Sequence, residues 1–316
     1  MDKRYAYSGN DTVGALVQTG LSAAGYTRTT DVASADVVLT YCTSQTALED
    51  AYFDEDGIVQ AARPGTLLVD LSAATPSFAR ELNAVAVVSE LAAVEAPLVV
   101  ANVALPDAFA DKANLMCLVA GEEKDVAAAR PLLEELAGDV QETGGSGSAQ
   151  LARAAYTLQA SAQIMSAIEA DALYHAVQRS ASSVEGPVGR AGATSPEAEQ
   201  VLSAVSEGRF TGTYTVEMLM AELSAALMAA DDVDLILPQA EACLHLLELL
   251  AVIGGADKAP AALALVYGEE AACAENGLDW TRAEQAYGGE ADEDDDYDYD
   301  VNPDDFPGGF GAYSAN

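Results

Sequence analysis

Basic residues are scarce in this sequence. Its 316 residues include 14 Lys and Arg, only four of them Lys, against 51 Asp and Glu, for a formal net charge of −37. Affinity for nucleic acid depends on basic side chains that neutralise phosphates, and anionic membrane surfaces repel an acidic chain. The composition therefore excludes a general phosphate-binding surface, and we expect neither a nucleic-acid nor a membrane partner.

Cysteine and histidine are also few. None of the four cysteines lies in a C-x-x-C pair, which favours reduced, mostly buried thiols in a cytoplasmic protein. The two histidines have no partner at ligand spacing, so we expect no metal site. The N-terminus has no apolar core typical of a signal peptide. The most apolar stretch, 235–253, carries Glu241, His245 and Glu248, which favours a buried helix over a membrane span.

The acidic residues are concentrated at one end. Residues 289–316 contain ten acids and no base, which leaves 41 acids and 14 bases, or −27, in residues 1–288. The run 292–300 has no periodicity and repels itself, as is typical of a disordered, solvated tail. The alternative is a docking strip for a basic partner, anchored by Tyr297, Tyr299, Phe306 and Phe310.

Residues 1–143 alternate short apolar strands with helices. This pattern is typical of an α/β fold with a parallel sheet covered on both faces. The expected strands are 4–8, 37–41, 66–71, 98–100, 115–119 and 140–143. The expected helices are 12–24, 76–85 and 131–137, the last two opened by proline.

After the glycine-rich residues 144–147 the period becomes helical. Residues 148–179 contain no Gly or Pro, which predicts one helix about 48 Å long that links domains or subunits. A Gly/Ser/Pro-rich loop at 180–195 precedes helices expected at 196–207, 214–230, 238–253, 260–275 and 279–287. We expect an α/β domain over 1–143, a long interdomain helix over 144–180, an all-α domain over 181–288 and a tail over 289–316.

This order of elements resembles the β-hydroxyacid dehydrogenase family, which includes 3-hydroxyisobutyrate dehydrogenase and 6-phosphogluconate dehydrogenase. The resemblance is carried by A-D-V-V-L-T (35–40), the segment 56–72 ending in L-L-V-D-L-S, and T-P-S-F-A-R-E-L (75–82), and more weakly by E-A-P (95–97) and G-S-G-S-A-Q-L-A-R (145–153). It implies a Rossmann-like domain, an all-α C-terminal domain, a homodimer, and an oxidoreductase that uses NAD or NADP on a small hydroxyacid, carbonyl or imine.

The turn G-N-D-T-V-G (9–14) occupies the place of the family's G-x-G-x-x-G. The middle glycine of that motif lets the backbone approach the pyrophosphate at a helix N-terminus. Here Asp11 adds a Cβ and a negative charge at that position. The alternative is a structural turn in which Asp11 or Thr12 caps the helix. The cofactor-binding positions implied by the resemblance are Gly9, Thr12, Gly14, Thr43 and Ser72.

The segment after Gly25 is short. The family places a strand, a helix and a further strand between Gly25 and the strand that follows Ala35, and nine residues cannot hold all three. We therefore expect a reduced second-strand unit. Residues 28–30 look like a 2′-phosphate cluster and Asp31 like the ribose acid, but neither stands at the right distance along a second strand.

The substrate positions also differ from the family. Its Ser-Gly-Gly is replaced by the apolar residues 99–101, its catalytic Lys by Arg153 and the Asn four residues on by Thr157, while a later Lys-Asp-Leu aligns with 221–223. Arginine stays protonated, so Arg153 can orient an anion or polarise a carbonyl but cannot transfer a proton. Asp70 and Ser72 remain at a strand end, either as ligand contacts or as caps for the next helix.

Two functional hypotheses remain open. The first is an NAD(P)-dependent oxidoreductase, motivated by the overall resemblance. The second is a catalytically inactive family member that acts as a dimeric binding or scaffold protein, motivated by the coincident departures at the cofactor turn, the second strand and the substrate positions.

Overall fold

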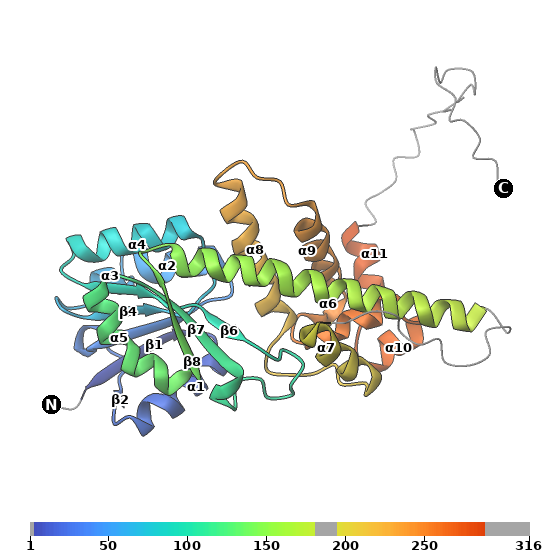
Figure 1. The fold of residues 1–316 in the computed structure, drawn as a ribbon, viewed down its shortest axis with the longest axis horizontal. Helices are drawn as coiled ribbons and strands as arrows, with labels where there is room; N and C mark the ends of the chain where they lie inside the picture. Colours follow the sequence, from blue (N-terminus) through green and yellow to red (C-terminus); the bar gives the residue numbers. More distant parts are fainter. Residues whose placement is uncertain (1–2, 181–194, 288–316) are drawn as a thin grey trace, which may run out of the picture.

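The computed structural model describes residues 3–180 and 195–287. An α/β layer structure is followed by one long helix, around whose second half the remaining helices gather (Figure 1). The C-terminal tail, 289–316, and nearly all of the expected loop 180–195 lie outside the described residues.

In the described part of the chain, eight strands form one sheet. They are β1 (Arg4–Gly9), β2 (Thr27–Arg28), β3 (Val37–Tyr41), β4 (Leu67–Asp70), β5 (Ala92–Glu95), β6 (Leu98–Val100), β7 (Leu115–Gly121) and β8 (Asp139–Gly144). Their order is β2-β1-β3-β4-β5-β7-β6, and β8 also pairs with β7. The first five are parallel, whereas β7 runs antiparallel to β5 and β6 and parallel to β8. The predicted Rossmann-like, mostly parallel sheet is confirmed.

Helices cover both faces of the sheet. One core cluster contains Val37 and Leu39 together with side chains of α1 (Asp11–Ala23) and α5 (Glu123–Leu136). A second contains Val38 together with side chains of α2 (Gln45–Phe53), α3 (Ile58–Ala61) and α4 (Pro76–Val88). Alternate residues of one strand thus enter different cores, which explains why the strand is an unbroken apolar run.

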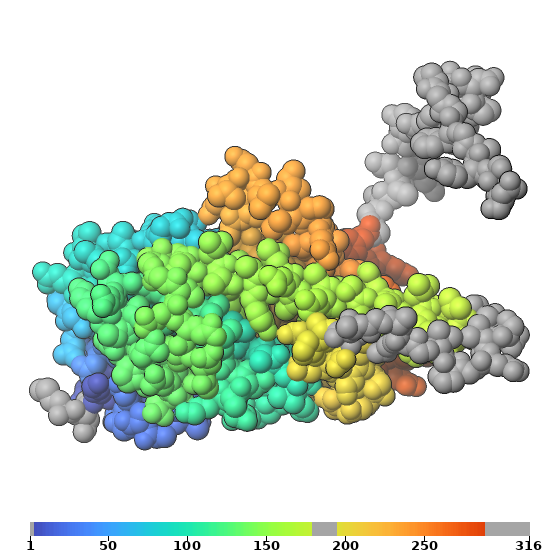
Figure 2. All heavy atoms as spheres, viewed as in Figure 1, coloured from blue at the N-terminus to red at the C-terminus, as the bar shows by residue number. Residues whose placement is uncertain are grey.

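The long helix α6 spans Ser148–Ser180, close to the range expected for it. It packs against α7 (Pro196–Ser206), α8 (Val216–Asp231) and α9 (Pro238–Leu250). Figure 2 shows α6 crossing the surface from the sheet to these helices. A π-helical turn, η3 (Ala251–Gly255), and the helices η4 (Pro260–Tyr267), α10 (Glu270–Glu275) and α11 (Thr281–Tyr287) complete the described fold.

Two expected helices were wrong in extent. The helix expected to begin at Pro131 begins at Glu123, because five buried residues along α5 (Val126, Ala129, Leu132, Leu133 and Leu136) provide packing that outweighs an internal proline. The single helix expected over 260–275 is the 3₁₀ helix η4 followed by α10, with the break at Gly268. The short elements β2, β5, α2 and α3 were not among those expected.

No single helix among the described residues is long and apolar enough to cross a membrane. The bent pair Pro238–Gly255 and Pro260–Tyr267 meets that criterion by length and composition only.

Candidate functional site

The turn between β1 and α1 lies where the strand order reverses between β1 and β3, the usual ligand position in such sheets. Gly9 has φ of 125°, and a Cβ there would clash with the carbonyl oxygen of Tyr41 at the end of β3. The Asn10 N–H donates to that same oxygen at 2.9 Å. A Cβ at Gly14 would lie 2.8 Å from the Tyr7 ring. Both outer glycines are therefore required by packing within the fold.

The cap of α1 is Asn10. Its Oδ1 accepts hydrogen bonds from the N–H groups of Thr12 at 2.9 Å and Val13 at 3.3 Å. The expectation that Asp11 or Thr12 caps the helix was wrong, because Asn10 is the last residue with non-helical dihedrals and Asp11 is already the first helical residue. Asp11 is exposed in the first turn.

The reduced second-strand unit consists of the two-residue strand β2. Thr27 and Arg28 pair with the first two residues of β1, and the Thr29 N–H extends the ladder to the Tyr5 carbonyl at 2.8 Å. Arg28 reaches back along α1, where its guanidinium donates to Gln18 at 3.3 Å. β2 therefore ends opposite Tyr5, well short of the glycine turn at Gly9.

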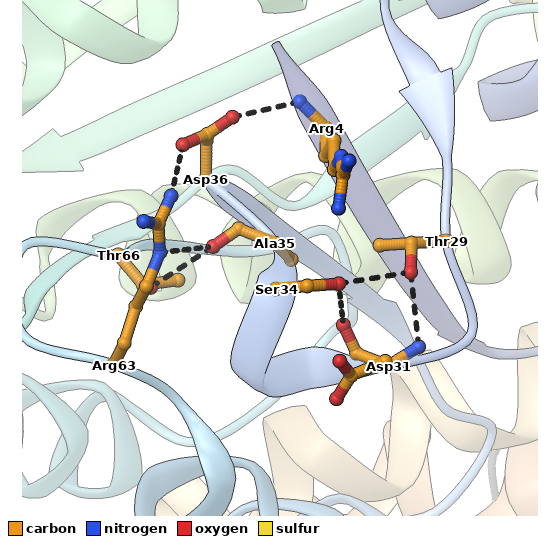
Figure 3. A network of polar contacts seen from close by, with 8 residues as sticks. All are labelled: Arg4, Thr29, Asp31, Ser34, Ala35, Asp36, Arg63 and Thr66. Carbon is orange, nitrogen blue, oxygen red and sulfur yellow. Dashed lines mark hydrogen bonds and ion pairs between the residues drawn. The ribbon is translucent and has the colours of Figure 1, made fainter.

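A polar turn returns the chain from β2 to β3 (Figure 3). Asp31 Oδ1 accepts from the Ala33 N–H at 3.1 Å and so caps the 3₁₀ turn η1 (Val32–Ser34), while Ser34 bonds Thr29 at 3.1 Å. Asp36 then accepts from the Arg4 N–H and forms an ion pair with Arg63. The structure thus uses Asp31 within the turn itself.

Ser72 and Asp70 lie in a buried network at the ends of β3 and β4. The Ser72 hydroxyl accepts from the Cys42 N–H at 2.9 Å, and Asp70 Oδ1 accepts from the Ser72 N–H at 3.0 Å and from Thr40 at 3.1 Å. Burial raises the pKa of Asp70 to about 6, although the bonds from Ser72 and Thr40 oppose the rise. This arrangement ties adjacent strand ends together.

Thr43, which follows β3, contacts the helical part of the molecule. Its hydroxyl donates to Glu217 in the first turn of α8 at 3.1 Å. The predicted cofactor positions Gly9, Thr43 and Ser72 therefore lie at or just after the carboxyl ends of three neighbouring strands, and Thr43 bridges the two parts of the chain.

Arg153 and Thr157 belong to a buried polar group between the sheet and the helices. The Arg153 guanidinium donates to the Leu98 carbonyl at 2.9 Å and to Thr157 at 2.7 Å, and it forms an ion pair with Glu222 of α8. The Tyr214 hydroxyl donates to the other oxygen of Glu222 at 2.7 Å. We call Arg153, Thr157, Tyr214 and Glu222 the Arg153 cluster.

The Arg153 cluster is almost completely shielded from water. Arg153 is 2% exposed and Glu222 5%. Burial alone would lower the pKa of the Arg153 guanidinium, but the Glu222 carboxylate raises it above the ordinary value for arginine. The cluster lines a cavity of about 20 Å³ together with Tyr156 and Glu197, which is room for about one water molecule.

Sequence reasoning did not single out three of the buried polar residues. Tyr214 and Glu222 join the Arg153 cluster, although Glu222 was noted only as part of an aligned tripeptide. Glu95, at the end of β5, accepts from the N–H groups of Gly147 at 2.6 Å and Ala149 at 3.1 Å, and so holds the start of α6. The available signal for Glu95 was an acid at the end of an apolar run, whereas nothing local marks Tyr214 or Glu222.

Within the described residues, no group of three or more His, Cys, Asp or Glu side chains could hold a metal ion. A glycine turn at the switch point of a mostly parallel sheet, joined by a long helix to a helical part, defines a Rossmann-like fold.

Comparison with known proteins finds sequence relatives of the N-terminal half of the chain. Residues 6–145 match the NAD binding domain of 6-phosphogluconate dehydrogenase. The NAD-dependent L-serine dehydrogenase of Pseudomonas aeruginosa is 33% identical over 141 residues, which cover 45% of each chain. A probable 3-hydroxyisobutyrate dehydrogenase of Mycobacterium tuberculosis is 32% identical over 153 residues, 48% of this chain and 49% of that protein. The chain thus spans about half the length of the curated relatives it matches.

Solved structures extend the likeness of fold to the helical part. Mycobacterium tuberculosis 3-hydroxyisobutyrate dehydrogenase with L-serine matches 85% of this chain and 100% of its own, with a TM-score of 0.65 at 23% identity. Psf3 in complex with NADP⁺ and 2-OPP matches 83% of this chain and 99% of its own, with a TM-score of 0.65 at 18% identity. Residues 6–145 are thus similar in sequence to the NAD binding domains of these dehydrogenases, and the fold of the longer chain is similar to that of 3-hydroxyisobutyrate dehydrogenase.

Proposed function

We propose that this protein is a divergent NAD(P)-dependent oxidoreductase that acts on a small substrate held at the Arg153 cluster. The observation that carries the proposal is the position of that cluster, which lies where the sheet meets α6 and α8 and is anchored to the Leu98 carbonyl at the start of β6. The family match supports NAD or NADP as the cofactor, which would supply or accept the hydride.

The residues of the cluster favour one kind of substrate among the hydroxyacid, carbonyl and imine classes. The positive charge of Arg153 is already offset by Glu222, and Glu197 adds a further acid to the cavity wall. Val100 and Ala101, which also line the cavity, offer no side-chain donor for a carboxylate. The arrangement therefore favours an uncharged carbonyl or an imine, which Arg153 or Tyr214 would orient through a hydrogen bond.

The closed geometry supports a second candidate, a catalytically inactive family member that acts as a binding or scaffold protein. The cavity has room for about one water, and Arg153 already has partners in Leu98, Thr157 and Glu222. For this candidate, the Arg153 cluster holds the sheet and α8 together. The departures from the family's cofactor turn would then not impair function, because no reaction is catalysed.

Either candidate would act as a homodimer. Apolar side chains are exposed on α6, where Leu173 is 66% exposed, and after α8, where Ile236 is 76% exposed. A groove of about 290 Å³ lies between α6 and α9, beside the segment that contains Ile236. We propose that two copies bury these surfaces together, in the cytoplasm, and that the acidic tail is available to a basic partner.

Titration of the full-length protein with NADH and NADPH, followed by fluorescence or calorimetry, tests the choice. Micromolar dissociation constants support the oxidoreductase, and values weaker than about 1 mM, worth only about −4 kcal/mol, contradict it. If the protein binds cofactor, Arg153→Lys should lower turnover in a screen of small carbonyls and imines without changing cofactor affinity. The matched control is Arg282→Lys, at an exposed arginine of the helical part. Equal turnover in both variants would contradict a role for Arg153.

A further inference from the structure

We propose that the Asn10 side chain is an internal competitor of the cofactor, occupying the backbone donors that would bind its pyrophosphate. The inference rests on the proposed function, because it concerns the same cofactor turn. It arises from a disagreement between fold and site. The strand, the outer glycines and the helix of a dinucleotide turn are all present, yet in this arrangement the N-terminus of α1 does not fit a phosphate.

A count of backbone donors shows the competition. The first N–H groups of a helix have no partner within it, and these are the groups a phosphate uses. Asn10 Oδ1 accepts from both Thr12 and Val13, while the Gly14 N–H donates to the Asn10 carbonyl at 2.9 Å. Among the backbone N–H groups of residues 10–14, the Asp11 N–H alone has no acceptor within the described residues. A pyrophosphate would therefore have to displace the Asn10 carboxamide.

The displacement requires only a side-chain rotation. The backbone of the turn is held in place, because the Asn10 N–H donates to Tyr41 and the Asn10 carbonyl accepts from the Tyr7 hydroxyl at 2.6 Å. The φ of −58° and ψ of 131° at Asn10 are open to any residue. Removing the carboxamide would free two donors already aimed at the ligand position and leave the turn otherwise unchanged.

Asp11 acts in the same direction through its charge. An acid in the first turn stabilises a helix, because the N-terminal end of the helix dipole is positive. The same carboxylate repels an approaching pyrophosphate. Asn10 and Asp11 thus both stabilise α1 at the expense of anion binding, so stability and cofactor affinity should change in opposite directions when either residue is replaced.

Asn10→Ala tests this opposition in the full-length protein. We expect its melting temperature to fall, because an N-cap is lost, while NADPH binds about tenfold more tightly than to the wild type. Asp111→Ala is the matched control, since Asp111 caps the distant turn η2 (Lys112–Asn114) by accepting from the Ala113 N–H at 2.9 Å. The control should lose stability without any gain in affinity. Equal or weaker NADPH binding by Asn10→Ala would overturn the proposal.

Asp11→Asn provides a second variant that keeps the size of the side chain. We expect it to bind NADPH about tenfold more tightly at low salt, with the gain shrinking as salt rises. Micromolar binding by the wild type that neither variant improves would overturn this inference and leave the proposed function standing. No binding by the wild type or by either variant would overturn both.

Discussion

Replacing Glu95 with Gln should remove a large part of the pH dependence of stability. Glu95 is 5% exposed, and one of its oxygens has no hydrogen-bond partner among the described residues. Burial raises the pKa of Glu95 to about 7; the N–H groups of Ala149 and Gly147 oppose the rise, and the neighbouring Asp70 adds to it. The native protein therefore keeps this carboxyl protonated at a pH where the unfolded chain has already ionised it.

The sign follows from proton linkage. Between the unfolded and the native pKa, the native state binds more protons than the unfolded state, so the free energy of unfolding falls as pH rises. The stability that Glu95 contributes is fully present below the pKa of this carboxyl in the unfolded chain. It is lost as pH rises through the native pKa of about 7. When pH rises from about 5.5 to about 8.5, stability is lost only until the native pKa of about 7 is reached, which is an interval of about 1.5 pH units. At ~1.4 kcal/mol for each unit, the free energy of unfolding falls by about 2 kcal/mol.

The assay is urea unfolding of wild type and Glu95→Gln at both pH values, followed by circular dichroism. Gln keeps an acceptor for Gly147 and Ala149 but cannot ionise, so we expect the wild type to lose about 2 kcal/mol more than the variant. Asp70, whose pKa is raised to about 6, ionises in both proteins, so most of its contribution cancels in the difference. Glu123→Gln, at an exposed acid in the first turn of α5, should behave as the wild type. Parallel pH profiles for wild type and Glu95→Gln would refute the reasoning.

Two further predictions concern the buried ion pair of Arg153 and the glycine turn after β1. Arg153→Met should lower the free energy of unfolding by about 3–5 kcal/mol, because it leaves the buried Glu222 carboxylate without its counter-charge. A second replacement, Glu222→Leu, should recover part of that loss, and a double variant no more stable than the single one would contradict this. Gly9→Ala should destabilise by more than about 2 kcal/mol, because its φ is positive and its methyl group would clash with the carbonyl oxygen of Tyr41. Gly145→Ala is the control and should have little effect, because a Cβ there meets no atom within 4 Å. Urea unfolding measures both glycine variants.

The parts of the fold that sequence reasoning predicted well depend on local patterns. The strand Val37–Tyr41 and the helix Ser148–Ser180 were expected at nearly their observed bounds, because apolar period and the absence of breakers act within a few turns. β2 was missed as an element, since two exposed residues carry no periodicity and pair only because β1 lies beside them. The start of α5 was misplaced because its buried face decides it more than Pro131 does.

The candidate site shows the same division. The resemblance marked Arg153 and Thr157, which the structure brings together one turn apart on α6. It did not mark Tyr214 as their neighbour, because that contact depends on how the segment before α8 packs against α6. The cap at Asn10 is a local feature that was nevertheless missed, because Asn10, Asp11 and Thr12 are all residue types that cap helices.

The sequence by itself determined that the chain is acidic and poor in lysine, that it alternates strands and helices before one long helix, and that a glycine turn follows the first strand. These are properties of composition and of short-range order. Only the tertiary structure decided that Glu222 neutralises Arg153, that Glu95 is buried against the start of α6, and that Asn10 occupies the donors of α1. Burial and pairing depend on which segments the topology brings together, and that information is not contained in any one segment.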